Sequence, residues 1–304
     1  MSQSPSDRAA KTKSKVQVFG ARLFSTLLLW AIVMGVFLSG NAWAFIGLML
    51  FLAVFGLREF FQMTKSGGMP SQPIWGMLVG VLYLAVIGFF MGSDGHEALD
   101  WMWNLDVLFV VLVVIGGLLI QLRKPIEGKN TVIEVAVTVL GFVYVAVLFS
   151  FLPRLLFLPI SDGEVPGAWL VIWLVAVTKF TDMGAYITGS ICGKHKMIPH
   201  ISPGKTWEGI AGALVFAQLA GCGLYVLLPD DLSILRCWSW VIGLVFLLAL
   251  LAVVGDLAES VLKRSIGVKD SGHTLPGIGG TLDLIDSLCF TAPALYFILI
   301  WINA

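Results

Sequence analysis

Charged residues are scarce in this chain. Lysine, arginine, aspartate and glutamate make up 12% of its 304 residues, whereas 58% are hydrophobic and the mean hydropathy is +0.92. A soluble globular domain carries about 25% charged residues, so this composition excludes that class. It indicates an integral membrane protein.

Cysteine and histidine are also few, with four residues of each type. No pair of them has the short spacing of a zinc site or of a disulfide framework, so we expect neither. We expect the cysteines to be small, buried apolar residues. The cysteines are Cys192, Cys222, Cys237 and Cys289.

Long apolar runs fill most of the sequence. A helix that crosses a bilayer needs about 20 mostly apolar residues, and short breaks rich in glycine, proline and charge separate nine such runs. The first run follows a polar, basic tail and lacks a small-residue cleavage site, so we expect it to be retained. The predicted fold is an all-α polytopic transmembrane bundle with spans at 21–39, 42–62, 73–92, 103–122, 131–152, 166–188, 207–228, 238–261 and 282–302.

The distinctive polar residues are concentrated in the last four spans. We therefore predict three parts, which are a cytoplasmic tail (1–20), an N-terminal packing half with spans one to five (21–165) and a C-terminal catalytic half with spans six to nine (166–304). Lysine and arginine also fall on one side of the bundle. All but three of the 19 lie in the tail and the even-numbered loops, and the exceptions are Arg154, Lys179 and Arg236. The positive-inside rule then predicts a cytoplasmic N-terminus, in a membrane of the bacterial inner (plasma) type. It also places the loops 189–206 and 262–281 in the cytoplasm.

The stretch 260–286 combines three cations, three carboxylates and a glycine-rich turn between two apolar segments. Ionisable residues at a membrane are usually functional, and cations, glycines and paired acids suit a metal-bound phosphate substrate. Asp256, Ser260, Lys263 and Arg264 share one face of span eight. A capped helix end would explain the two cations, but it would not explain Asp256 inside an apolar run. Asp283 and Asp286 are three residues apart and can face one site.

Two further motifs lie near the ends of spans six and seven. Lys179 and Asp182 can pair on one helix face, either as a structural ion pair or as part of a site. Gly-Lys-Thr at 204–206 lacks the earlier glycine and the strand context of a P-loop. A simpler interpretation is a helix start with Ser202 as the N-cap and Pro203 at the first position. The free N–H groups of the first helical turn would favour an anion.

These three motifs resemble, in order, those of the phosphatidate cytidylyltransferases, also called CDP-diacylglycerol synthases. The resemblance covers about residues 179–290. The matching residues are Asp182, Ala185, Tyr186, Gly189, Ser202, Pro203, Lys205, Thr206, Glu208, Gly209, Ser260, Lys263, Arg264, Lys269, Asp270, Gly272, Pro276, Gly277, Gly279, Gly280, Asp283 and Asp286. Ile278 and Leu284 stand where the family has histidine and arginine, so any contact from those two side chains is absent.

The resemblance implies transfer of a cytidylyl group from CTP to phosphatidic acid, which yields CDP-diacylglycerol and pyrophosphate for phospholipid biosynthesis. It implies Mg²⁺ as cofactor, alone or with a second cation, held first by Asp256 and Asp283 and next by Asp286 and Asp182. Asp256, Asp283, Lys263 and Arg264 are the candidate catalytic residues. The candidate substrate-binding residues are Tyr186, Ser202, Lys205, Thr206, Glu208, Ser260, Lys269, Asp270, Gly277, Gly279 and Gly280.

The expected partners are CTP, phosphatidic acid and membrane lipid, without nucleic acid, and a homodimer stays open. Two other functions compete with the transferase. A CTP-dependent lipid-alcohol kinase would need a similar phosphate-rich site. A transporter could use Lys179, Asp182 and Asp256 along a path, but transporters often repeat broken helices in both halves, whereas these polar residues lie in one half and at one membrane face.

Overall fold

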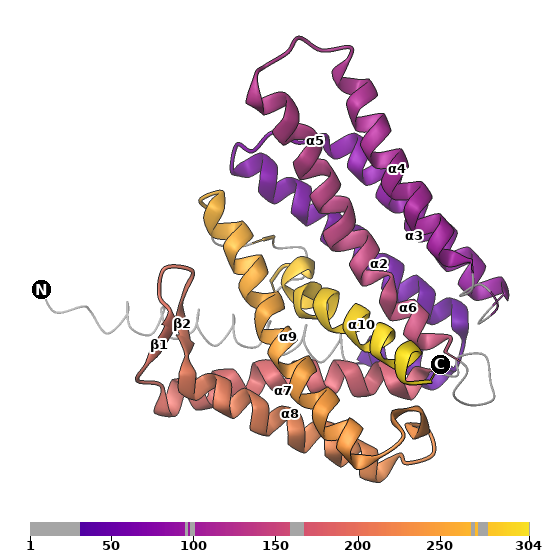
Figure 1. Ribbon diagram of the computed structural model, residues 1–304, viewed down its shortest axis with the longest axis vertical. Helices are drawn as coiled ribbons and strands as arrows, with labels where there is room; N and C mark the ends of the chain where they lie inside the picture. Colours follow the sequence, from indigo (N-terminus) through magenta and orange to yellow (C-terminus); the bar gives the residue numbers. More distant parts are fainter. Residues whose placement is uncertain are drawn as a thin grey trace, which may run out of the picture.

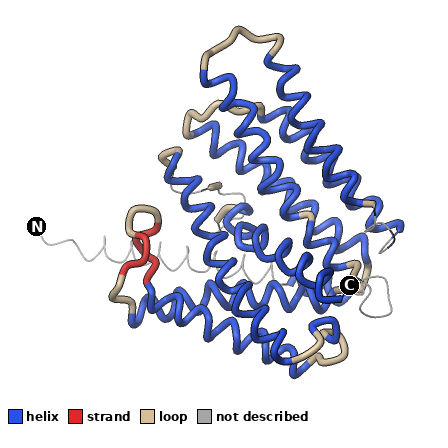
Figure 2. The backbone as a smooth tube through the Cα atoms, viewed as in Figure 1, coloured by secondary structure: helices blue, strands red, loops and turns tan. Residues whose placement is uncertain are grey.

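The computed structural model describes residues 31–94, 97, 101–158, 167–268, 271–272 and 279–303. Apart from one short hairpin, the regular structure in these ranges is helical (Figures 1 and 2). Residues 31–39 form a helix. The elements that follow are α2 (Ala42–Ser66), α3 (Pro73–Asp94), α4 (Met102–Gln121), α5 (Lys129–Gly141), η2 (Phe142–Val147), α6 (Phe151–Leu156), α7 (Ala168–Cys192), β1 (Lys196–Ile198), β2 (Ser202–Thr206), α8 (Trp207–Leu227), η3 (Ser233–Leu235), α9 (Trp238–Ser265) and α10 (Thr281–Asn303).

Eight helices within the described ranges are long and apolar enough to cross a membrane. They coincide with predicted spans two to nine, which confirms the polytopic helical bundle. Predicted span five corresponds to a continuous helical rod, 129–156, in which the π-helical turn η2 joins α5 to α6. The first predicted span, 21–39, lies mostly outside the described residues. The outward face of α4 is apolar and exposed, as a lipid-facing surface should be. Its exposed residues are Val107, Leu108, Val111, Leu112, Ile115, Leu118 and Leu119.

A buried polar network ties α3, α4 and α6 together. Arg154, one of the three cations outside the tail and the even-numbered loops, lies in α6 and is 1% exposed. Its guanidinium forms a forked ion pair with Asp106, in which Nη1 lies 2.9 Å from Oδ2. The Tyr83 hydroxyl donates to the same carboxylate at 2.8 Å. The cation can be buried because it is paired and hydrogen-bonded. The sequence pattern did not reveal that Asp106 is its partner.

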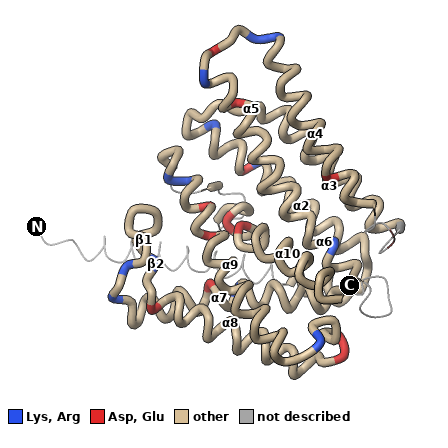
Figure 3. Tube along the Cα trace, viewed as in Figure 1, with Lys and Arg blue, Asp and Glu red and all other residues tan. Residues whose placement is uncertain are grey.

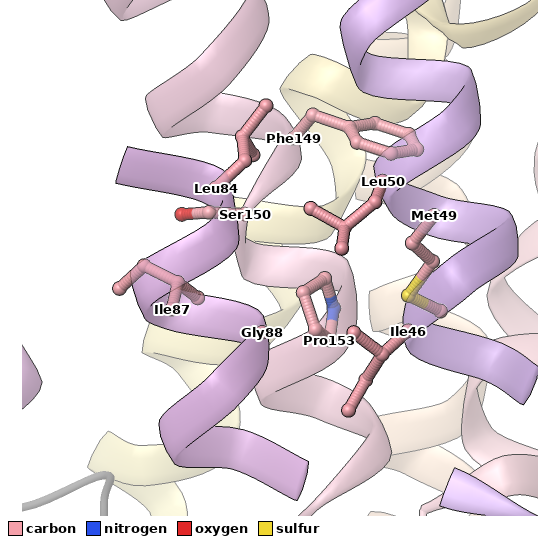
Figure 4. A pocket seen from close by; sticks show the side chains of 9 residues that line it. All are labelled: Ile46, Met49, Leu50, Leu84, Ile87, Gly88, Phe149, Ser150 and Pro153. Carbon is pink, nitrogen blue, oxygen red and sulfur yellow. The ribbon is translucent and has the colours of Figure 1, made fainter. Parts of the chain in front are cut away.

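Tight apolar packing surrounds this network. Figure 4 shows the residues of α2, α3 and the η2–α6 segment that line one small gap. The gap has a volume of about 10 Å³, and Ser150, its one hydroxyl-bearing residue, donates to the carbonyl of Val147. An ordered water needs at least this much room and two or more polar partners. The gap is therefore a packing imperfection and not a ligand site.

The C-terminal helices are arranged around α10. In Figure 1, α7 and α8 run side by side across one end of the molecule, and α10 lies between α9 and α2. The α7–α8 pair approaches closely at Gly184, where an added Cβ would lie 2.7 Å from the carbonyl oxygen of Gly212. Since α10 contacts both α9 and α2, its position depends on helices that are far apart in the sequence.

The cysteines depart from expectation. Cys289 is buried and Cys222 half-buried, but Cys192 and Cys237 are exposed. Both lie at helix ends, where the chain leaves the packed core. All four are free thiols, so no disulfide framework is present, as predicted.

Candidate active site

A cavity of about 640 Å³ opens between α7, β2, α8, α9 and α10. Figure 3 shows charged segments on α7, α9 and α10 in the interior of the fold, next to the hairpin. The residues proposed from sequence that line this cavity are Asp182, Tyr186, Ser202, Lys205, Thr206, Asp256, Lys263, Asp283 and Asp286. Three motifs spread over 105 residues of sequence are thus brought to one place.

The first wall of the cavity is an antiparallel hairpin that leads into α8. Ser202 was predicted to be the helix N-cap, but residues 202–206 form strand β2 and α8 begins at Trp207. Thr206 is the N-cap, and its hydroxyl accepts a hydrogen bond from the amide of Gly209 at 3.1 Å. Backbone pairing of β2 with β1 keeps the segment extended, so a helical start at Ser202 does not form.

The extended hairpin directs Lys205 into the cavity. Its ammonium group lies 2.8 Å from a carboxylate oxygen of Asp256 and donates to the carbonyl of Val253 at 3.3 Å. The Lys205 side chain is 20% exposed and that of Asp256 is 41% exposed. The pair therefore crosses from the hairpin to α9 at a position that an anionic substrate can reach.

A second cation lies deeper. Lys263 bonds two carboxylates, Glu259 at 2.8 Å and Asp283 at 2.7 Å, and so links α9 to α10. Glu259, which was not among the residues predicted from sequence, is 1% exposed and also lines the cavity. The available signal was its position one helical turn before Lys263, within an apolar run. Its Oε1 atom has no hydrogen-bond partner within the described part of the chain.

Asp182 and Asp286 supply further negative charge. Asp286 is 4% exposed and accepts a hydrogen bond from the hydroxyl of Ser287 at 3.1 Å. Lys179 lies 3.6 Å from Asp182, as the i,i+3 spacing predicts, and donates to the carbonyl of Leu284 at 3.0 Å. This ion pair therefore also connects α7 to α10.

Several predicted residues do not line the cavity. Glu208 accepts hydrogen bonds from the backbone amides of Lys194 and His195, and Arg264 donates to the carbonyl of Ile201 at 3.4 Å. Both side chains thus hold the hairpin segment from outside. Ser260, Gly279 and Gly280 are also absent from the lining. Lys269, Asp270 and Gly277 lie outside the described residues.

The charge balance of the cavity favours a bound cation. Five carboxylates line it, against the three ammonium groups of Lys196, Lys205 and Lys263. Within the described ranges, however, no three His, Cys, Asp or Glu side chains are grouped so that they could hold a metal ion by themselves. Mg²⁺ is typically bound by one or two carboxylates together with substrate phosphates. The donor set fits that mode of binding.

Comparison with known proteins agrees with the motifs. Residues 20–302 match the model of the cytidylyltransferase family. A phosphatidate cytidylyltransferase of Staphylococcus haemolyticus is 32% identical over 83% of this chain and 90% of its own length. One of Bacillus subtilis is 31% identical over 80% and 84%. The uncharacterized protein YnbB of Escherichia coli is 32% identical over 88% and 84%.

Proposed function

Because this chain belongs to the cytidylyltransferase family, we propose that it is a membrane phosphatidate cytidylyltransferase. It converts CTP and phosphatidic acid into CDP-diacylglycerol and pyrophosphate. One observation carries the proposal beyond the family. A single cavity between transmembrane helices presents three lysine ammonium groups and five carboxylates, which can balance the charge of a triphosphate, a lipid phosphate and a cation.

The reaction asks little of the protein in proton transfer. An oxygen of the phosphatidate attacks the α-phosphorus of CTP, the bond from that phosphorus to the bridging oxygen breaks, and pyrophosphate leaves with the electron pair. The lipid phosphate is already an anion, so no strong base is required. The barrier comes from bringing two polyanions together, which positioning and opposite charge lower.

Two lysines of the cavity, Lys205 and Lys263, take that electrostatic role. Lys205 is carried by the hairpin and is the more accessible of the two, so it meets the triphosphate on entry. Lys263 is fixed between two carboxylates of the interior, so its ammonium group is already oriented before substrate arrives. A preorganised cation of this kind stabilises developing charge without reorganising during the reaction.

Asp256 and Asp283 would hold Mg²⁺, alone or with a second cation, and Asp286 and Asp182 are the next candidates. When bound, the metal would neutralise phosphate charge and act as a Lewis acid. Asp256 and Asp283 each bond a lysine in the structure, so substrate and cation would exchange partners with Lys205 and Lys263. Phosphate oxygens of the nucleotide would complete a donor set of this kind.

We also propose that the cavity opens toward the cytoplasm of a bacterial cell. The relatives are bacterial, and CTP is a cytoplasmic nucleotide. The ends of α2 and α9, the α4–α5 connection and the hairpin carry lysine or arginine (Figure 3). The positive-inside rule favours this face as the cytoplasmic one.

Labelled CTP distinguishes this reaction from its nearest alternative. Purified protein is incubated with CTP that is labelled in either the α- or the γ-phosphate and with either phosphatidic acid or diacylglycerol as acceptor, and lipids are separated by thin-layer chromatography. Cytidylyl transfer moves the α-label into lipid and releases the γ-label as pyrophosphate. A kinase would instead move the γ-label onto a lipid alcohol, and that result would refute the proposal. Protein with Asp256→Asn, prepared in parallel, controls for host enzyme.

A further inference from the structure

A carboxylate from the N-terminal half reaches the catalytic end of α10. Glu59 lies in α2 and is 0% exposed. Its Oε2 atom accepts a hydrogen bond from the backbone amide of Leu282 at 2.8 Å, across 223 residues of sequence. No motif of the sequence indicated this contact, because span two shows only an isolated acid within an apolar run.

The contact completes the N-terminal cap of α10. A capping box needs two hydrogen bonds, one from the N-cap amide to the third helical side chain and one from an early helical amide to the N-cap side chain. Asp283 supplies the first, since its Oδ2 accepts from the amide of Gly280 at 3.2 Å. Gly280 has no side chain for the second. Glu59 takes that place from another helix by accepting from Leu282.

Two glycines make room for the Glu59 carboxylate. A Cβ added at Gly272 would lie 2.5 Å from Glu59 Oε1, and one added at Gly280 would lie 2.9 Å from Glu59 Oε2. A Cβ atom does not approach another heavy atom this closely, so a larger residue at 272 would displace the carboxylate or the backbone. The buried acid thus accounts for glycine at 272, whereas at 280 it shares the restriction with the hydroxyl of Ser271, which an added Cβ would meet at 2.2 Å.

We propose that Glu59 is a positioning residue for the active site. By capping α10 it fixes the first turn of that helix against α2, and that turn carries Asp283. The other carboxylate oxygen of Asp283 bonds Lys263 on α9, so a shift of the turn would disturb the lysine as well. The inference rests on the proposed function for its effect on catalysis, but the cap itself is a property of the fold.

Three variants at this position and one neighbouring control test the proposal. Glu59→Ala removes the acceptor, Glu59→Gln keeps an amide oxygen in the same place, and Glu59→Asp keeps the charge on a shorter stem. Arg58→Gln, on the exposed face of the same turn, is the control. Hydrogen exchange of the 279–290 segment and the rate of cytidylyl transfer are measured on each protein in detergent, with the Mg²⁺ dependence of the rate.

Glu59→Ala is expected to speed amide exchange in the first turn of α10 and to lower kcat by about 100-fold, since small displacements of catalytic groups have effects of this size. It should also raise the Mg²⁺ concentration needed for half-maximal rate. Glu59→Gln should recover most of both. Unchanged exchange with Glu59→Ala would overturn the capping role. If Glu59→Gln lowers kcat as much as Glu59→Ala does but leaves amide exchange normal, the negative charge of Glu59 and not its capping hydrogen bond supports catalysis.

A double-mutant cycle covers the case in which Glu59→Ala folds poorly. Gly272→Ala should lower the cytidylyl-transfer rate in the wild type, and it should lower the rate less in a protein that also carries Glu59→Asp. The shorter acid leaves space for the added methyl group. Strict additivity would contradict the packing argument. A wild-type protein without cytidylyl transfer would refute the proposed function alone, and the exchange measurement would still decide whether Glu59 caps α10.

Discussion

At the scale of single residues, two lysines of the cavity, Lys205 and Lys263, are paired with acids, but they differ in setting. Lys205 lies on an extended strand and contacts one partly exposed aspartate. Lys263 lies on a helix between two acids, one of them almost completely buried. The difference predicts different consequences of mutation, because a broken buried pair leaves an uncompensated charge and a broken accessible pair does not.

Replacing Asp256 or Asp283 with asparagine should lower the cytidylyl-transfer rate by about 100-fold or more, while the protein still inserts and folds. A divalent cation at these positions contributes several kcal/mol to the transition state. Rates are measured as a function of Mg²⁺ concentration, with Asp231→Asn, in the loop before α9, as control. Near-normal rates of both variants at limiting Mg²⁺ would remove them from the metal site.

Lys263→Gln should lower the rate far more than Arg264→Gln does. The neighbouring arginine contacts the hairpin outside the cavity, whereas Lys263 faces the substrate space. Loss of a preorganised phosphate contact corresponds to about 2–4 kcal/mol in the transition state. The steady-state rate and the melting temperature in detergent are measured for each variant.

A double variant separates catalysis from charge balance. Lys263→Gln alone leaves Glu259 buried without its ammonium partner, and this lowers stability as well as activity. Glu259→Gln in the same protein removes the unpaired charge. Stability should then recover and activity should not. Recovery of both would show that Lys263 serves only the fold.

At the scale of elements, hydrogen bonds between helices set the positions of the catalytic groups. The hairpin segment is held by Glu208 and Arg264, α10 is held by Glu59 and Lys179, and α6 is held by Asp106. Each contact joins segments that are distant in sequence or belong to different elements. Helix packing in a bilayer relies on such polar contacts and on close packing, because lipid offers little hydrophobic drive between helices.

Asp106→Asn should destabilise the protein by about 3–5 kcal/mol, because it leaves the Arg154 guanidinium buried and unpaired. Lys124→Gln is the matched control. It breaks an ion pair with Glu134 in which the lysine side chain is 46% exposed, and such pairs contribute about 1 kcal/mol or less. Thermal unfolding in detergent measures both. Equal shifts of the melting temperature would show that the buried network is not a major source of stability.

At the scale of the whole molecule, the two exposed cysteines mark opposite sides of the proposed membrane. Cys192 ends α7 beside the hairpin, and Cys237 precedes α9 at its far end. The hydrogen bond with Ser239 lowers the pKa of the Cys237 thiol, which favours the reactive thiolate. The chain therefore contains its own topology probes.

Proteins that retain only one of these cysteines should react differently with a membrane-impermeant maleimide. In spheroplasts, Cys237 should be labelled and Cys192 should be protected until the membrane is opened. This follows from a cytoplasmic N-terminus and hairpin. A protein without cysteine controls for background. Labelling of Cys192 in sealed spheroplasts would reverse the orientation and with it the argument for CTP access.

The sequence by itself determined the spans and the motifs. Apolar runs of about 20 residues have few alternatives to a transmembrane helix, and helical spacing correctly placed Lys179 beside Asp182. Asp283 and Asp286, three residues apart, also lie in one cavity as their spacing suggested. The division into packing and catalytic halves and the roles of the site residues remain predictions.

Only the tertiary structure decided the contacts between segments. Periodicity describes one helix at a time, so it could not show that Glu59 caps α10, that Glu259 binds the lysine that also holds Asp283, or that Arg154 is buried against Asp106. It also could not show that strand pairing would move the start of α8 from Ser202 to Trp207. These outcomes depend on which helices lie side by side, because a carboxylate in an apolar run acquires its role from the amide or cation that packing brings to it.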